Sequence, residues 1–113
     1  MKVLRLTRHG ATPEQLDELR RIFGDDCVVT EVSETVPDAA RVTAICAEYG
    51  ADVLEAVLPL PLMAEVVNPR TGVGIPVIRA ITNRMLDASG EKAIFAFSHY
   101  EKVIKVEVVT ERL

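Results

Sequence analysis

Residues 2–15 have the sequence KVLRLTRHGATPEQ and contain the two signals that decide the fold. The first is the apolar segment 2–6, which predicts a β-strand. The second is a helix start, in which Thr12 acts as the cap, Pro13 takes the first helical position and Gln15 completes a capping box. A strand that leads directly into a capped helix indicates an α/β protein.

The same alternation continues along the chain. The spacing of apolar residues predicts helices over residues 13–23, 36–49, 60–67 and 76–86. Further strands are predicted over residues 27–32, 52–58, 92–97 and 103–110, and a loop over residues 98–102. This order predicts an α/β fold, a single Rossmann-like three-layer domain over residues 1–113. We expect a mostly parallel sheet of strand order 2-1-3-4, with an antiparallel C-terminal strand at its edge.

The apolar residues predict a core and an assembly. The side chains that we expect to be buried in central strands are Leu4, Leu6, Val53, Leu54, Val57, Ile94, Phe95 and Phe97. Around the short third helix, more apolar side chains occur than one sheet face can cover, which predicts a homodimer. Those side chains are Leu58, Leu60, Leu62, Met63, Val66 and Val67.

The composition excludes several classes of protein. The chain has 113 residues, of which 49% are hydrophobic and 27% charged, and its net charge is −4. That acidity argues against general binding to duplex nucleic acid. No apolar run is long enough to span a membrane, and no signal-peptide pattern follows Met1, so we expect a cytoplasmic protein without a membrane partner. Cys27 and Cys46 are predicted to be buried thiols, and no metal or cofactor is predicted.

Polar residues follow several strands of the predicted sheet at the same edge. Since the carboxyl ends of parallel strands share one rim, this edge is the expected binding site. We predict His9 and His99 as catalytic groups, because histidine titrates near neutral pH. The ligand-binding residues that we predict there are Thr7, Arg8, Gly10, Thr12, Ser98, Tyr100 and Lys102. Arg8 and the start of the first helix favour an anion.

Two family resemblances bear on this rim. Residues 6–12, LTRHGAT, resemble the L-x-R-H-G-x-T opening of the histidine phosphatases. That resemblance implies that His9 is a phosphorylated nucleophile and that Arg8 binds phosphate, with His99 in the place of the second histidine. The chain is shorter than the histidine-phosphatase fold normally requires, and Tyr100 occupies the position after the second histidine, where the family usually has glycine.

The second resemblance covers nearly the whole chain. Its motifs are the T-x-H-x-A-T-P-E-Q pattern of residues 7–15, the G-A-D-V strand start at 50–53 with the Pro-rich turn 58–62, and the F-A-F-S strand end at 95–98. This chain resembles small bacterial and phage proteins and, more distantly, the CRISPR-associated Rossmann-like (CARF-type) proteins. The resemblance implies a dimer that senses cyclic oligoadenylates, and some members cleave them as ring nucleases.

The residues that the CARF resemblance carries over are Thr7, His9, Thr12, Ser98 and the segment after it. Relatives usually have basic residues where His99 and Tyr100 stand, and residues 68–74 are an insertion. The function predicted from the sequence is therefore CARF-type nucleotide binding, with metal-independent ring-nuclease activity as its enzymatic form. A histidine-phosphatase-like enzyme that uses His9, and a non-enzymatic dimeric interaction protein, are the two alternatives.

Overall fold

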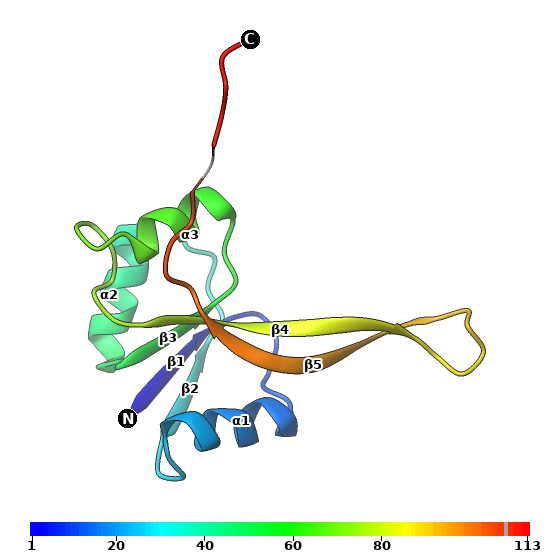
Figure 1. Cartoon of the computed structure of the whole chain (residues 1–113). Coiled ribbons are helices and arrows are strands. Elements are labelled where there is room, and N and C mark those ends of the chain that lie inside the picture. Colours follow the sequence, from blue (N-terminus) through cyan, green and yellow to red (C-terminus); the bar gives the residue numbers. More distant parts are fainter. Residues whose placement is uncertain (108) are drawn as a thin grey trace.

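The protein is a three-layer α/β domain in the computed structural model, which describes residues 1–107 and 109–113. Figure 1 shows α1 on one face of a five-stranded sheet and α2 and α3 on the other. The elements in chain order are β1 (Lys2–Leu6), α1 (Pro13–Phe23), β2 (Val28–Val32), α2 (Ala39–Tyr49), β3 (Val53–Ala56), α3 (Leu60–Val67), β4 (Val77–Leu86) and β5 (Ala93–Lys102).

The sheet has the strand order β2-β1-β3-β4-β5. The first four strands are parallel to one another, and β5 pairs antiparallel with β4 at the edge. This arrangement confirms the predicted fold class. β4 pairs with β3 only through Val77 and Ile78, so most of the β4–β5 hairpin extends beyond the parallel part of the sheet.

Local sequence signals account for the helix ends. The Thr12 hydroxyl accepts a hydrogen bond from the Gln15 amide and the Gln15 side chain accepts one from the Thr12 amide, which is the predicted capping box. The Asp38 carboxylate caps α2 by accepting from the Arg41 amide. Gly50 ends α2 in the left-handed conformation, with φ of 60°, which glycine adopts without steric cost.

The core consists of two apolar layers, one on each face of the sheet. Under α1, the buried side chains of Val3, Leu19, Val53 and Ile78 pack together. The larger layer, under α2 and α3, includes Leu4, Leu6, Val42, Ile45, Leu54, Met63, Val66 and Val77. Burial of Leu4, Leu6, Val53 and Leu54 was predicted and is confirmed. Met63 and Val66 are covered within one chain, and therefore do not supply the dimer surface predicted around α3.

The C-terminal third differs from the sequence prediction. Residues 76–86 were predicted as a helix, but Val77–Leu86 is the strand β4. The predicted loop over residues 98–102 is wrong as well, because β5 continues through it to Lys102. Residues 103–110 were predicted as a strand; the described residues of this segment form none, and residue 108 lies outside the described residues.

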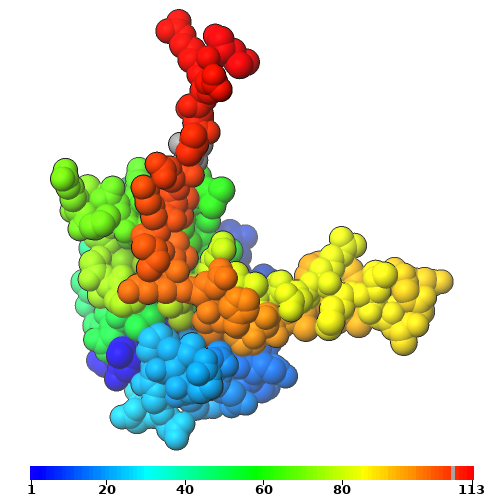
Figure 2. All heavy atoms as spheres, in the orientation of Figure 1, coloured from blue at the N-terminus to red at the C-terminus, as the bar shows by residue number. Residues whose placement is uncertain are grey.

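The misassigned hairpin also changes the predicted core. Phe95 is 68% exposed, Ile94 is exposed and Phe97 is only partly covered, because the outer part of the hairpin projects away from the layers. Val57, predicted to be buried, lies past the end of β3 and is exposed. Figure 2 shows the hairpin and the C-terminal segment as two projections from the body. None of the described helices has the length and apolar character needed to cross a bilayer.

Candidate functional site

Three charged side chains lie side by side across the centre of the sheet. Arg5 of β1 is paired in register with Glu31 of β2 on one side and with Glu55 of β3 on the other. The Arg5 and Glu55 side chains are only 3% and 2% exposed. Charged groups are rarely so deeply buried unless they are paired, so the hydrogen bonds of this row need a full account.

Arg5 uses its guanidinium to bridge the whole row. Its Nε and Nη2 donate to the two Glu55 carboxylate oxygens, over 2.9 and 3.2 Å, and its Nη1 donates to Glu31 over 2.8 Å. The remaining contacts are with Gln15 and with the backbone carbonyl oxygen of His9. Tyr100 of β5 completes the cluster by donating its hydroxyl to Glu55 over 2.8 Å. A bidentate guanidinium–carboxylate contact is the strongest form of such a pair.

The pKa values of this cluster respond to its burial and its hydrogen bonds. Burial on its own lowers the pKa of Arg5, but the bonds to Glu55 and Glu31 outweigh it and leave this pKa above its usual value. The amide of Ala11 and the guanidinium of Arg5 lower the pKa of Glu31. Burial and the bond to Glu55 raise the pKa of Tyr100. At neutral pH the Glu31 carboxylate and the Arg5 guanidinium are therefore charged, and the phenol of Tyr100 is neutral.

The charged row fixes the loop that follows β1. Arg5 holds the carbonyl of His9, and Glu31 accepts a hydrogen bond from the amide of Ala11 over 2.8 Å. The Thr7 hydroxyl accepts from the His9 amide within the same loop. Residues 7–11 are thus tied to the charged side chains of the sheet at two points and to each other at a third, which positions Arg8 and His9 at the rim.

A cavity of about 550 Å³ opens at this rim. Its walls come from three segments: the end of β1 with the loop after it (residues 6–9), the β2–α2 connection (34–37) and the β3–α3 connection with the first residues of α3 (57–62). The rim between β1 and β3 is where the chain reverses direction across the sheet, and open α/β sheets bind ligands there. The volume falls in the range of pockets for small molecules.

The cavity has a polar end and apolar walls. Thr7, Arg8 and His9 provide the polar end, and the guanidinium of Arg8 donates to the Thr35 hydroxyl over 3.1 Å. Glu34 also lines the cavity, but both of its carboxylate oxygens accept hydrogen bonds from Arg41, one from Nε and one from Nη2, which lowers the pKa of Glu34. Arg8 itself forms no ion pair within the part of the chain that the structure describes. The apolar walls are Leu6, Val36, Pro37, Val57, Leu58, Pro59, Pro61 and Leu62.

The structure brings together only some of the residues predicted for the site. Thr7, Arg8 and His9 line the cavity, whereas Gly10 lies further along the loop and Thr12 caps α1. The other predicted residues, Ser98, His99, Tyr100 and Lys102, lie on β5 instead of on a rim loop, and none of them lines this cavity.

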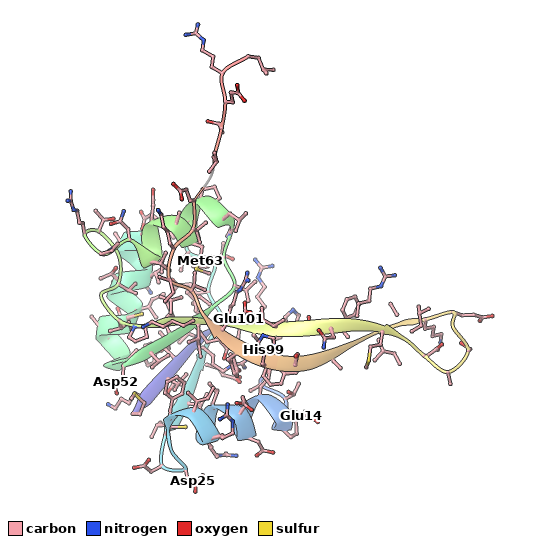
Figure 3. The ribbon with its side chains drawn as sticks, in the orientation of Figure 1. Glu14, Asp25, Asp52, Met63, His99 and Glu101 are labelled. Carbon is pink, nitrogen blue, oxygen red and sulfur yellow. The ribbon has the colours of Figure 1, made fainter. Side chains whose placement is uncertain are left out.

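The β5 residues form two separate arrangements. Tyr100 points to the α1 face, where it binds Glu55. Ser98 and His99 are hydrogen-bonded to each other over 2.8 Å, and His99 lies 3.3 Å from Glu101, which pairs with Arg79 across the hairpin. Figure 3 shows His99 and Glu101 at the inner part of the hairpin. A smaller cavity of about 220 Å³, lined by Arg79 and Ile81, shares only Val57 and Leu58 with the rim cavity.

The charged row, and the wall of the rim cavity that the β2–α2 connection forms, were not predicted from the sequence. A signal for the row was present, since Arg5 and Glu55 are charges inside strands KVLRL and VLEA that are otherwise apolar apart from the exposed first residue, Lys2. A charge in a strand buried on both faces requires a partner. Thr35 and Glu34 gave no such signal, because polar residues before a helix are common in any connection.

Comparison with known proteins identified no significant match to this chain. No protein-family model matches it, and neither a curated protein nor a solved structure matches it significantly. The features of this chain that bear on its function are therefore the rim cavity and the charged row that positions the loop beside it.

Proposed function

We propose that the rim cavity binds a nucleotide through its phosphodiester and its base. One observation carries the proposal: a single concave site has an Arg8 guanidinium at one end and apolar walls from Val36, Pro37 and Leu62 around the rest. A nucleotide has the same division, an anionic phosphate joined to a flat and largely apolar base. Arg8 is the group for the phosphate, because a guanidinium matches two phosphate oxygens at once.

The ligand class that we propose is cyclic oligoadenylate, which the CARF resemblance implies. One cavity takes one nucleotide-sized part of such a ring, so a homodimer with two cavities is the proposed functional unit. A cytoplasmic location belongs to the same proposal. The rim residues that carry the proposal are Thr7, Arg8 and His9, since the other predicted residues lie outside the cavity.

A ring-nuclease reaction is the proposed activity of this site. A ribose 2′-oxygen attacks the adjacent phosphorus, the bond from phosphorus to the 5′-oxygen breaks, and the products carry a 2′,3′-cyclic phosphate and a 5′-hydroxyl. His9 accepts the proton of the 2′-hydroxyl and returns a proton to the 5′-oxygen, the general acid–base role that histidine takes most often in enzymes. Arg8 offsets the charge that develops on the phosphate oxygens.

Calorimetry with cyclic tetra-adenylate and cyclic hexa-adenylate tests the binding. We expect Arg8→Ala to weaken the affinity by roughly 10–150-fold, the usual effect of losing a charge-assisted hydrogen bond. Arg20→Ala, which removes an exposed guanidinium on the outer surface of α1, serves as the control. Equal affinities for wild type and Arg8→Ala, or no binding by the wild type, contradict the proposal.

Product analysis separates binding from turnover. His9→Ala is expected to bind cyclic adenylate like the wild type and to release no linear product. If the wild type binds cyclic adenylate but forms no product, the protein is a sensor of this ligand and not a nuclease. Phosphate found covalently on His9 after incubation with a phosphate ester identifies the histidine-phosphatase alternative instead.

A further inference from the structure

The outer part of the β4–β5 hairpin lacks the support that the rest of the sheet has. We call residues 82–97 the arm; it comprises the β4 and β5 residues beyond Ile81 and the turn that joins them. β3 ends at Ala56, and its last pair with β4 is Glu55–Ile78, so the arm is a two-stranded ribbon without a third strand. Figures 1 and 2 show it projecting from the body. A two-stranded hairpin alone in water is marginally stable.

The turn of the arm is nevertheless well formed. The amide of Asp87 donates to the carbonyl of Lys92 and the Gly90 amide to the carbonyl of Asp87, over 2.9 and 3.0 Å. The Asp87 carboxylate accepts from the amide and the hydroxyl of Ser89. The sequence therefore specifies the turn of this hairpin locally, whereas the large apolar side chains Leu86 and Phe95 are exposed in the single chain.

One face of the arm carries two phenylalanines and a leucine, together with Thr82 and Arg84. Phe97 is opposite Thr82, Phe95 opposite Arg84 and Ala93 opposite Leu86, and side chains of directly opposed residues share one face. The Phe97 ring contacts the half-buried Tyr100 ring, with centroids 5.1 Å apart, so this face continues outward from the core under α1. We call Leu86, Phe95 and Phe97 the aromatic face; Phe95 and Leu86 are 68% and 62% exposed.

These residues have the composition of a buried strand but lie in solvent. Two of the three Phe residues of the chain are on the arm, and the opposite face adds the exposed Met85 and Ile94. The radius of gyration, 15.7 Å, exceeds the value of about 13 Å expected for a compact domain of this length, and both the arm and the projecting C-terminal segment contribute to it. The exposed apolar side chains of the arm indicate that the single chain is an incomplete packing unit.

We propose that a second copy of this chain covers the aromatic face, with the arms of the two copies packed against each other about a two-fold axis. The charges near the turn are balanced, with Arg84 and Lys92 against Asp87 and Glu91. Such a set favours self-association, in which basic and acidic groups of the two copies meet, over a strongly charged partner such as nucleic acid or an anionic membrane. An isologous contact also pairs the unsupported ribbon with another ribbon.

This interface differs from the surface that the sequence indicated. Leu60 of α3 belonged to that predicted surface and is 62% exposed, like Leu86 of the arm. The two sites are therefore a matched pair for a test. The dimer at the arm specifies the partner in the proposed function, but its test uses no nucleotide, so either proposal can fail alone.

Light scattering at micromolar concentration measures the assembly directly. We expect a dimer for the wild type and for Leu60→Lys, and a folded monomer of 12.4 kDa for Phe95→Lys. Leu86→Lys, on the neighbouring strand of the same face, must give the same monomer, and circular dichroism checks that each variant is folded. A wild-type monomer overturns the proposal, as does a dimer that Leu60→Lys dissociates and the arm variants do not. If either arm variant fails to fold, the other decides.

Discussion

The guanidinium of Arg5 and the carboxylate of Glu55 form a bidentate pair that is buried between the sheet and α1, with N–O distances of 2.9 and 3.2 Å. The two residues are 50 positions apart in the chain and directly opposite in the β1–β3 register. Because Glu31 and Tyr100 bind the same pair from β2 and β5, one ionic cluster joins four of the five strands. It also holds the loop that carries Arg8 and His9.

Removing one partner of this pair is expected to destabilise the fold strongly. Arg5→Met leaves the Glu55 carboxylate buried without its counter-charge, and the free energy of unfolding in urea should fall by about 3–5 kcal/mol. Arg20→Met, in the exposed pair with Asp17, should leave it unchanged within error.

The double variant Arg5→Met, Glu55→Leu tests the same explanation. It removes both charges, so it should recover part of the stability that Arg5→Met loses. A loss below about 1 kcal/mol for Arg5→Met contradicts the view that the buried charge needs its partner.

Tyr100 is expected to make stability depend on alkaline pH. Its phenol donates to Glu55, and burial with this bond raises its pKa above the ordinary value of about 10. A group whose pKa is higher in the folded state stabilises the fold below its unfolded pKa, and that contribution is lost as the pH rises above about 10.

The comparison of wild type with Tyr100→Phe isolates this contribution. At pH 7 the variant should lose about 1.5–3 kcal/mol, because a bond to a charged acceptor is removed. The difference between the two proteins should shrink as the pH rises past 10 in a series of urea titrations. Tyr49→Phe, at the exposed end of α2, is the matched control, and a constant difference up to pH 11 rules the explanation out.

Local signals in the sequence were enough to predict the first two-thirds of the fold. Thr12, Gln15 and Gly50 act within a few residues of their own positions, so their caps depend on little else. The predicted bounds of α3, 60–67, match the structure. The order of the first three strands followed from the α/β alternation, which leaves few arrangements, whereas residues 92–97, predicted as the parallel fourth strand, belong to the antiparallel edge strand β5.

The hairpin could not be predicted in the same way. Val77, Ile78, Ile81 and Met85 have helical spacing, but Val77, Ile78, Ile81 and Thr82 are β-branched and favour a strand, and the pairing with β5 decides between the two. Because residues 76–86 were predicted as a helix, Ser98 and His99 were assigned to a rim loop, whereas they lie within β5. The sequence marks Arg5 and Glu55 as charges in apolar strands, but it does not contain the register that aligns Glu31, Arg5 and Glu55, so their alignment could not be predicted before the strands were paired.

The rim loop should loosen when Glu31 is removed. Its carboxylate accepts from the Ala11 amide and from Arg5, and both contacts lower its pKa. Glu31→Ala is expected to raise the hydrogen-exchange rate of the Ala11 amide by roughly tenfold, the equivalent of about one hydrogen bond. Glu34→Ala, which removes only the bond to Arg41, should leave that amide unaffected.

The same loop should respond to acid. A carboxylate whose pKa is lowered in the folded state stabilises it above its ordinary pKa near 4.5, and the contribution disappears as the pH falls below that value. The protection factor of the Ala11 amide should therefore drop below pH 4.5 in wild type and stay flat in Glu31→Ala. Equal pH profiles for the two proteins contradict the role of Glu31.

Gly72 is expected to be essential to the turn after α3. A Cβ atom at this position would lie 2.2 Å from the Val66 carbonyl oxygen and 2.5 Å from that of Asn68. Both are backbone atoms of the turn itself: the Gly72 amide donates to Asn68 over 2.8 Å, and the Val73 amide donates to Val66 over 3.0 Å. Gly72→Ala must therefore break the turn or displace the end of α3, and we expect a loss of about 1–3 kcal/mol in the free energy of unfolding.

At Gly10 the nearest atom to an added Cβ is a Glu31 carboxylate oxygen at 3.9 Å, so Gly10→Ala should be neutral or slightly stabilising, since alanine restricts the unfolded chain. Urea unfolding of both variants gives the comparison, and equal stabilities for the two would show that the backbone around residue 72 yields without cost.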